Sequence, residues 1–229
     1  MSIAAALLRP CLVDTSLLTN FLYSGHISLL RELVGQPLCI TPSILDPSEI
    51  PFVSAGSITF TSEVFRPLSA TKEKQERYKD ILPHISSFAR QEGALWTKVD
   101  LSSSELALAL SFRDRAIWDS CPAGTRKRKR GLGAGEAEVV AVTVSRKWTA
   151  LLDDQAAVDL LRGLWREAPI LRTCALIVHA VISGLIDCKS AERLFNENIC
   201  KDLLFNCINP DTGNTLRLKC DPPRCEWLP

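Results

Sequence analysis

The chain has 229 residues, of which 46% are apolar and 23% charged, an ordinary balance for a folded globular protein with one large domain. Its net charge of +1 excludes a partner recognised through overall charge, so any nucleic-acid contact has to come from a local patch. The longest apolar run, about 13 residues from Cys174, is shorter than a membrane span. We therefore expect a cytoplasmic protein with no membrane partner.

The first fifty residues alternate short apolar strands with helices. Residues 11–13 are typical of a buried strand that ends at Asp14, and a helix opens at Thr15. A second helix is expected at 27–34, and residues 37–45 favour a second strand. Strands that alternate with helices in this way predict a parallel α/β sheet.

The middle of the chain, residues 51–130, is less regular. Residues 72–93 predict a polar helix with Pro83 as the place of a bend. Residues 93–101 favour a strand, and Ser102 begins the Ser-x-x-Glu pattern of a helix-starting capping box.

The last third of the chain returns to clear elements. An apolar helix is expected at 137–144, a strand at 150–152 and a helix at 155–165. Two further helices are expected at 171–186 and 191–198.

Acidic residues stand at four of the predicted junctions between strand and helix. They are Asp14, either Asp46 or Glu49, Glu136, and the pair Asp153 and Asp154. Each acid alone could cap a helix or offset its dipole, which is worth about 0.3–2 kcal/mol. The carboxyl ends of parallel strands share one edge, where ligands bind at the reversal of strand order, so we expect the acids to converge. Clustered carboxylates repel one another unless a cation lies among them, which favours Mg²⁺ or Mn²⁺ and metal-activated hydrolysis of a phosphodiester.

Four motifs, taken in order, resemble a PIN domain, and most of all the bacterial group related to VapC-type toxins. They are LVDTSLL from Leu12, ITPSIL from Ile40, GLGAGEAEVVAVTVSRKWTALLDDQAAVDLL from Gly131, and RTCALIVHAVISGLIDCKSAERLF from Arg172. The resemblance implies a three-layer α/β/α fold with a parallel central sheet and C-terminal helices. The resemblance also implies a single domain over residues 1–200, which includes an enlarged insertion at 51–130, and a C-terminal tail at 201–229.

The resemblance also implies a Mg²⁺-dependent nuclease centre that acts on RNA. Asp14 matches the first acid of the family, Glu136 the acid that opens the central helix, and Asp154 the acid after the later strand. The second acid is either Asp46 or Glu49, and the spacing favours Glu49.

The expected catalytic residues are therefore Asp14, Glu49, Glu136 and Asp154, and the expected ligands of Mg²⁺ or Mn²⁺ are Asp14, Glu136, Asp153 and Asp154. Glu138 lies about 200° round the helix from Glu136, so both cannot face one metal. We interpret Glu138 as a plain helix-start acid.

Five consecutive basic residues precede the GEAE helix. They are Arg126, Lys127, Arg128, Lys129 and Arg130. Beside an acidic nuclease edge, such a run predicts that these side chains bind the phosphate backbone of RNA. The alternative is a solvated loop that binds no ligand.

If the chain is a toxin, a small antitoxin protein would bind and block the acidic edge. The oligomeric state stays open, with a homodimer as one alternative.

The chain contains nine cysteines, an odd and high count. Five of them are scattered and are interpreted as small buried side chains in a reducing compartment: Cys11, Cys39, Cys121, Cys174 and Cys188. The last four have the spacing C-x6-C-x12-C-x4-C: Cys200, Cys207, Cys220 and Cys225. Four thiolates could hold a structural zinc, but the close CxxC pair typical of zinc sites is missing, so incidental cysteines in a tail are the alternative.

The sequence thus predicts a Mg²⁺-dependent endoribonuclease of PIN type, with a toxin of a toxin–antitoxin pair as one form. A second hypothesis is a catalytically weak or inactive PIN-like module that binds nucleic acid or protein. A third hypothesis treats the acids as unrelated helix caps in some other α/β domain.

Overall fold

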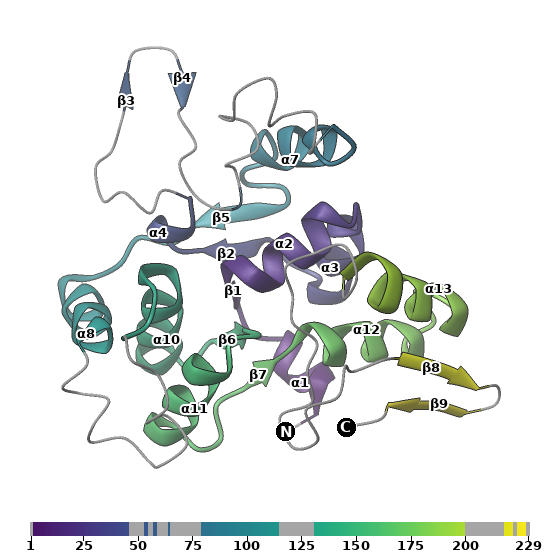
Figure 1. The fold of residues 1–229 in the computed structure, drawn as a ribbon. Coiled ribbons are helices and arrows are strands. Elements are labelled where there is room, and N and C mark those ends of the chain that lie inside the picture. The colour runs from purple at the N-terminus through teal and green to yellow at the C-terminus, as the bar shows by residue number, and fades with distance from the viewer. Residues whose placement is uncertain are drawn as a thin grey trace.

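A five-stranded parallel sheet forms the centre of the protein (Figure 1). The computed structural model describes residues 2–45, 53–54, 57–58, 64, 79–114, 131–199, 218–221 and 224–227. The strand order is β5-β2-β1-β6-β7. The strands are β1 (Cys11–Val13), β2 (Leu38–Ile40), β5 (Trp96–Lys98), β6 (Thr149–Leu151) and β7 (Ile170–Leu171). The predicted α/β class with a parallel sheet is confirmed.

Helices cover both faces of the sheet. One face carries α4 (Pro42–Leu45), α8 (Ser103–Arg113), α10 (Ala134–Arg146) and α11 (Gln155–Leu164). The other carries α2 (Thr15–Tyr23), α3 (Ile27–Val34), α12 (Thr173–Ile182) and α13 (Cys188–Arg193), which continues as the π-helix η3 (Leu194–Ile199). The remaining elements are α1 (Ile3–Leu7), α7 (Leu82–Ala89) and the antiparallel hairpins β3 (Val53–Ser54) with β4 (Ser57–Ile58) and β8 (Leu218–Asp221) with β9 (Arg224–Trp227).

The strand order reverses between β1 and β6. The chain runs outward from β1 through β2 to β5, and then returns to the other side of β1 to add β6 and β7. In open parallel sheets, the crevice at the carboxyl ends of the strands on either side of such a reversal is where ligands bind. The residues that directly follow β1 and β6 are therefore the first candidates for function.

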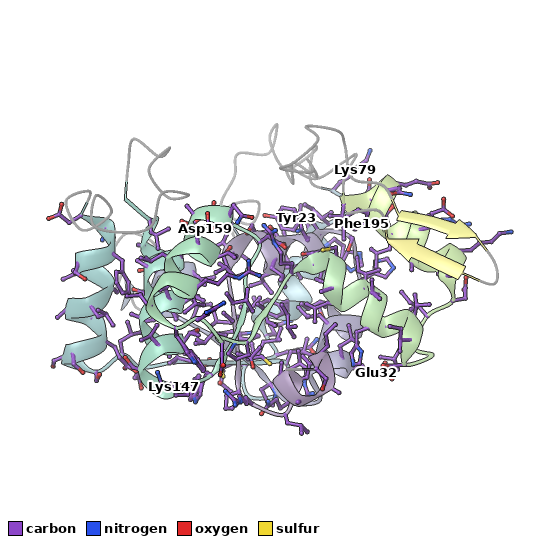
Figure 2. The ribbon with its side chains drawn as sticks, turned by 90° about the horizontal axis from the view of Figure 1, so that it is seen from below. Tyr23, Glu32, Lys79, Lys147, Asp159 and Phe195 are labelled. Atoms are coloured by element: carbon purple, nitrogen blue, oxygen red, sulfur yellow. The ribbon has the colours of Figure 1, made fainter. Side chains whose placement is uncertain are left out.

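Helix α10 is enclosed by its neighbours. It contacts α4, α8 and α11 and lies on β1 and β6, and all residues from 137 to 143 are buried. A helix that is surrounded in this way carries apolar residues on all sides, which explains the unbroken apolar run in the sequence. Lys147, labelled in Figure 2, directly follows the helix, and its Nζ lies 4.6 Å from the centroid of the Trp165 ring.

The capping box predicted at Ser102 is confirmed and anchors α8 against α10. The backbone N–H of Ser102 donates to Glu105 Oε2 (2.8 Å), and the backbone N–H of Glu105 donates to Ser102 Oγ (3.3 Å). Arg146 Nε at the end of α10 donates to Glu105 Oε1 (2.7 Å). This bond with Arg146 lowers the pKa of Glu105 to about 2.

Several predicted boundaries differ from the structure, such as the strand expected at 93–101, which spans only Trp96–Lys98, and three differences have a local reason. The strand expected at 37–45 stops at Ile40, because Pro42 begins α4. Pro83 lies in the first turn of α7 rather than at a bend, since proline suits the start of a helix. The helix expected from 171 begins at Thr173, and the two residues before Arg172 form β7, which the apolar pattern alone did not separate from the helix.

The cysteines are only partly as predicted. Cys11 and Cys39 are free and buried, and Cys174 is free and half-buried. Cys188 is in a disulfide bond, so its interpretation as an unpaired thiol is wrong. Cys121, Cys200 and Cys207, and the side chains of Cys220 and Cys225, lie outside the described residues, and zinc there stays a prediction. In the described part of the chain, no helix is long and apolar enough to cross a membrane.

Candidate acidic site at the reversal of strand order

Asp14 lies at the carboxyl end of β1, beside the reversal, and is only 2% exposed. Its backbone N–H still pairs with Leu151 O of β6 (2.9 Å). Its side chain caps α2, because Oδ2 accepts hydrogen bonds from the Ser16 N–H (3.3 Å) and the Ser16 hydroxyl (2.5 Å). Burial, together with the negative charge of Glu136, raises the pKa of Asp14 to about 7.

Glu136 lies in the first turn of α10, close enough to Asp14 for their charges to interact. Its Oε2 accepts a hydrogen bond from the backbone N–H of Gly133 (3.1 Å), which makes it the acid of a capping box. Asp14 and Glu136 are thus brought together from positions 122 residues apart, as the sequence predicted for the strand edge.

Gly135 allows the first turn of α10 to come close to the acidic edge. A Cβ at this position would lie 2.8 Å from Ile44 Cγ1 of α4 and 3.7 Å from Thr15 Oγ1, next to Asp14. The first distance is shorter than real Cβ contacts, so for any larger residue either the Ile44 side chain or one of the helices α4 and α10 has to shift.

Gly135→Ala is therefore expected to lower the free energy of unfolding by about 1–3 kcal/mol, the usual cost of overpacking. This loss exceeds the gain of at most about 1 kcal/mol from better helix propensity. Urea unfolding of the variant and the parent measures the difference. Gly133→Ala is the matched control, because its added Cβ meets Glu136 Oε2 only at 3.6 Å. Equal midpoints for Gly135→Ala and the parent would show that the contact is easily relieved.

Asp154 caps α11 on the same side of the sheet as α10. Its Oδ1 accepts hydrogen bonds from the backbone N–H groups of Ala156 (2.9 Å) and Ala157 (3.0 Å). The capping roles considered for Asp14, Glu136 and Asp154 are all confirmed. Capping fixes the position of a carboxylate without using all of its lone pairs, since an ionised carboxylate has about four acceptor sites.

Asp153 belongs to a separate buried group. Its Oδ1 accepts from the backbone N–H of Thr173 (2.9 Å), and its Oδ2 accepts from the Thr173 hydroxyl (2.5 Å) and from Asn20 Nδ2 (3.2 Å). Asn20 Nδ2 also lies 3.1 Å from Thr173 Oγ1. Burial raises the pKa of Asp153. The carboxylate thus joins the end of β6 to α2 and to the first turn of α12.

The pleat of the sheet explains why neighbouring acids take different partners. Val13 pairs with Leu151, so these two side chains point to one face. Asp14, the next residue of β1, points to the face of α10, whereas Asp153, two residues beyond Leu151, points to the face of α2 and α12. The structure thus places Asp14 with Glu136 and gives Asp153 a set of protein donors instead. Counting the alternation from the strand ends would have predicted this separation.

Glu138 is not a plain helix-start acid, and this interpretation is wrong. It is 7% exposed, and its two oxygens accept from the Ser43 backbone N–H (3.0 Å) and the Ser43 hydroxyl (2.6 Å). The helix-start role belongs to Glu136, which caps the α10 N-terminus. Glu138 instead fastens α4 to α10. The predicted divergence of Glu136 and Glu138 round the helix is confirmed.

The remaining predicted site residues lie outside the described residues. They are Asp46, Glu49, Arg126, Lys127, Arg128, Lys129 and Arg130. Within the described ranges, no three His, Cys, Asp or Glu side chains lie close enough together to hold a metal ion. Comparison of the chain with protein-family models, curated proteins and solved structures finds no match. The resemblance to PIN domains therefore stays a prediction from the motifs.

Proposed function

We propose that this protein is a Mg²⁺-dependent endoribonuclease of PIN type. The observation that carries the proposal is the buried carboxylate of Asp14, which lies at the reversal of strand order beside Glu136 and has a pKa of about 7. A buried carboxylate that is costly to ionise on its own is strongly stabilised by a cation beside it. Its position matches the place where parallel sheets bind ligands.

The acids fit a hard divalent cation such as Mg²⁺ or Mn²⁺, which prefers oxygen ligands. Asp14 and Glu136 would hold it together with one acid from Asp46 or Glu49, and Asp154, which does not form a group of three with them in the structure, would have to move toward the cation to join them. The bonds of Asp153 with Asn20 and Thr173 favour a supporting role for this residue. When bound, the cation would lower the pKa of a water so that it can attack a phosphodiester.

The residues of the chain itself would orient the site and bind RNA. The Ser16 hydroxyl and backbone hold Asp14, and the close approach at Gly135 sets the distance between α10 and β1. Arg126 to Arg130 would contact RNA phosphates, since the run directly precedes the residues that lead into α10. If the protein is a toxin of the cytoplasm, its antitoxin would cover this acidic edge.

The second candidate is a PIN-like module without activity, which would bind nucleic acid or protein. The observation that favours it is that Asp14, Glu136 and Asp154 each act as a helix cap. Caps need no cation, so an inactive protein could keep all three acids for stability.

RNA cleavage with Mg²⁺ or Mn²⁺, and with a chelator as control, distinguishes the two candidates. The nuclease proposal expects cleavage by the parent only with metal. It also expects Glu49→Gln to lower the rate by about 100-fold or more, as the loss of a group that supports a metal site does, and Asp46→Asn to leave it nearly unchanged. The reverse order of the two variants would move the second acid to Asp46. Absence of metal-dependent cleavage by the parent would favour the inactive module.

A further inference from the structure

Thr41 carries a buried hydroxyl without a hydrogen-bond partner. The residue directly follows β2 and is 0% exposed, and its Oγ1 has no hydrogen-bond partner among the described residues. In the described part of the chain, one other buried side-chain N or O atom shares this property, Thr143 Oγ1 on α10. Burying an unpaired hydroxyl costs about 1–3 kcal/mol, so such a group calls for a partner that the described residues do not supply.

The register of the sheet places Thr41 beside Asp14. Leu12 of β1 pairs with Cys39 of β2, so the residues two further along, Asp14 and Thr41, lie level with each other. Partners in parallel strands project to the same face, about 4.8 Å apart between strands. The Thr41 hydroxyl therefore points to the same side of the sheet as the Asp14 carboxylate.

The neighbouring helices close the space around Thr41. Helix α4 begins at the next residue, and Ser43 and Ile44 of α4 contact the first turns of α10 at Glu138 and Gly135. The corner between β1, α4 and α10 thus contains two buried carboxylates, Asp14 and Glu138, and Glu138 is already bonded to Ser43. It also contains the Thr41 hydroxyl, which has no partner among the described residues.

We propose that Thr41 is a positioning residue of the acidic site, and that its hydroxyl holds a buried water beside the Asp14 carboxylate. A buried water makes about three hydrogen bonds to polar groups, and Thr41 and Asp14 supply two partners of suitable kind. Mg²⁺ and Mn²⁺ keep several waters when they bind to carboxylates, so this water would also be a ligand of the cation. The inference rests on the proposed function, because it names a further residue of the same metal site.

The test is calorimetric titration of the full chain with Mn²⁺, without RNA. Thr41→Val removes the hydroxyl and keeps the branched shape, and it is expected to lower Mn²⁺ affinity about tenfold, as loss of a partner that orients a metal ligand does. Thr41→Ser keeps the hydroxyl and is expected to bind like the parent.

Thr143→Val is the matched control, because it removes the other unpaired hydroxyl. Thr143 lies seven residues beyond Glu136, about 10 Å further along α10, so Mn²⁺ affinity should not change. Without metal, Thr143→Val should be as stable as the parent or more stable, since it loses an unpaired polar group. If Thr41→Val unfolds, Thr41→Ala provides a second variant without the hydroxyl.

Three results would overturn the inference. Parent-like Mn²⁺ affinity in Thr41→Val or Thr41→Ala would show that the hydroxyl takes no part, while the metal site itself would stand. An equal loss in Thr143→Val would show that core packing, rather than a water beside Asp14, causes the effect. No Mn²⁺ uptake by the parent would contradict the proposed function, and the role of Thr41 with it.

Discussion

Asp14→Asn is expected to abolish metal-dependent RNA cleavage and, in the same protein, to raise the stability of the fold above pH 7. The loss of cleavage follows from the proposed role of Asp14 as a metal ligand beside Glu136. The gain in stability follows from burial, which makes the ionised carboxylate costly. Asparagine caps helices as well as aspartate does, so the start of α2 is preserved.

The sign of the stability change follows from the raised pKa of Asp14. The folded protein holds this proton up to about pH 7, whereas an unfolded chain releases it at about pH 4. The contribution of Asp14 to stability is therefore fully present below about pH 4 and is lost as the pH rises to about 7. The difference of about three pKa units corresponds to as much as about 4 kcal/mol above pH 7, which Asp14→Asn should recover.

Thermal or urea unfolding of Asp14→Asn and the parent at pH 5 and pH 8 measures this difference. The difference in stability between Asp14→Asn and the parent should be larger at pH 8 than at pH 5. Asp187→Asn is the matched control. Asp187 also caps a helix, α13, but it is exposed, and it does not belong to the residues that follow β1 or β6. It should leave both cleavage and the pH dependence unchanged. A loss of stability in Asp14→Asn at pH 8 would show that Asp14 serves mainly to hold the fold.

Asp153→Ala is expected to lower the free energy of unfolding by about 2–5 kcal/mol, the opposite change from Asp14→Asn. The substitution leaves the Thr173 N–H, the Thr173 hydroxyl and Asn20 without their shared acceptor in the core. Each buried group that loses its partner costs about 1–3 kcal/mol, although the three losses do not add in full.

Chemical denaturation measures the change in the free energy of unfolding for Asp153→Ala. Two further variants serve as comparisons. Asp153→Asn keeps one oxygen for the Thr173 N–H and should be intermediate. Asp154→Ala removes only the cap of α11 and should cost about 1 kcal/mol. A smaller loss for Asp153→Ala than for Asp154→Ala would contradict the structural role of the Asp153 group.

Local sequence patterns predicted the parallel sheet because strands and helices alternate with clear apolar periods. They also predicted which acids follow strands, since Asp14 and Asp153 directly end apolar runs. The strand β7 consists of only two residues and lies just before α12. It is too short for the apolar pattern of the sequence to separate it from the helix.

The partners of the acids could be predicted less well, because they depend on contacts far apart in sequence. Asn20 and Thr173 meet Asp153 only after α2 and α12 pack on the same face. The bond between Ser43 and Glu138 depends on the close packing of α4 against α10. Buried polar residues in the helices, such as Asn20, were a further signal beside the alternation along the strands, since a buried polar group needs a partner.

The glycines before α10 also have a more specific role than their number suggests. Gly135 is required by the approach to Ile44, whereas Gly133 begins the helix and offers its N–H to Glu136. The contact distances identify two positions where a Cβ would collide: Gly135, with Ile44 Cγ1 at 2.8 Å, and Gly131, with the backbone oxygen of Arg113.

The most direct test of the central claim is calorimetric titration of the parent and Asp14→Asn with Mn²⁺ at pH 8. The account predicts that the parent takes up Mn²⁺ and that Asp14→Asn, although more stable, takes up none. No uptake by the parent, or equal uptake by both proteins, would contradict a cation site at the reversal of strand order.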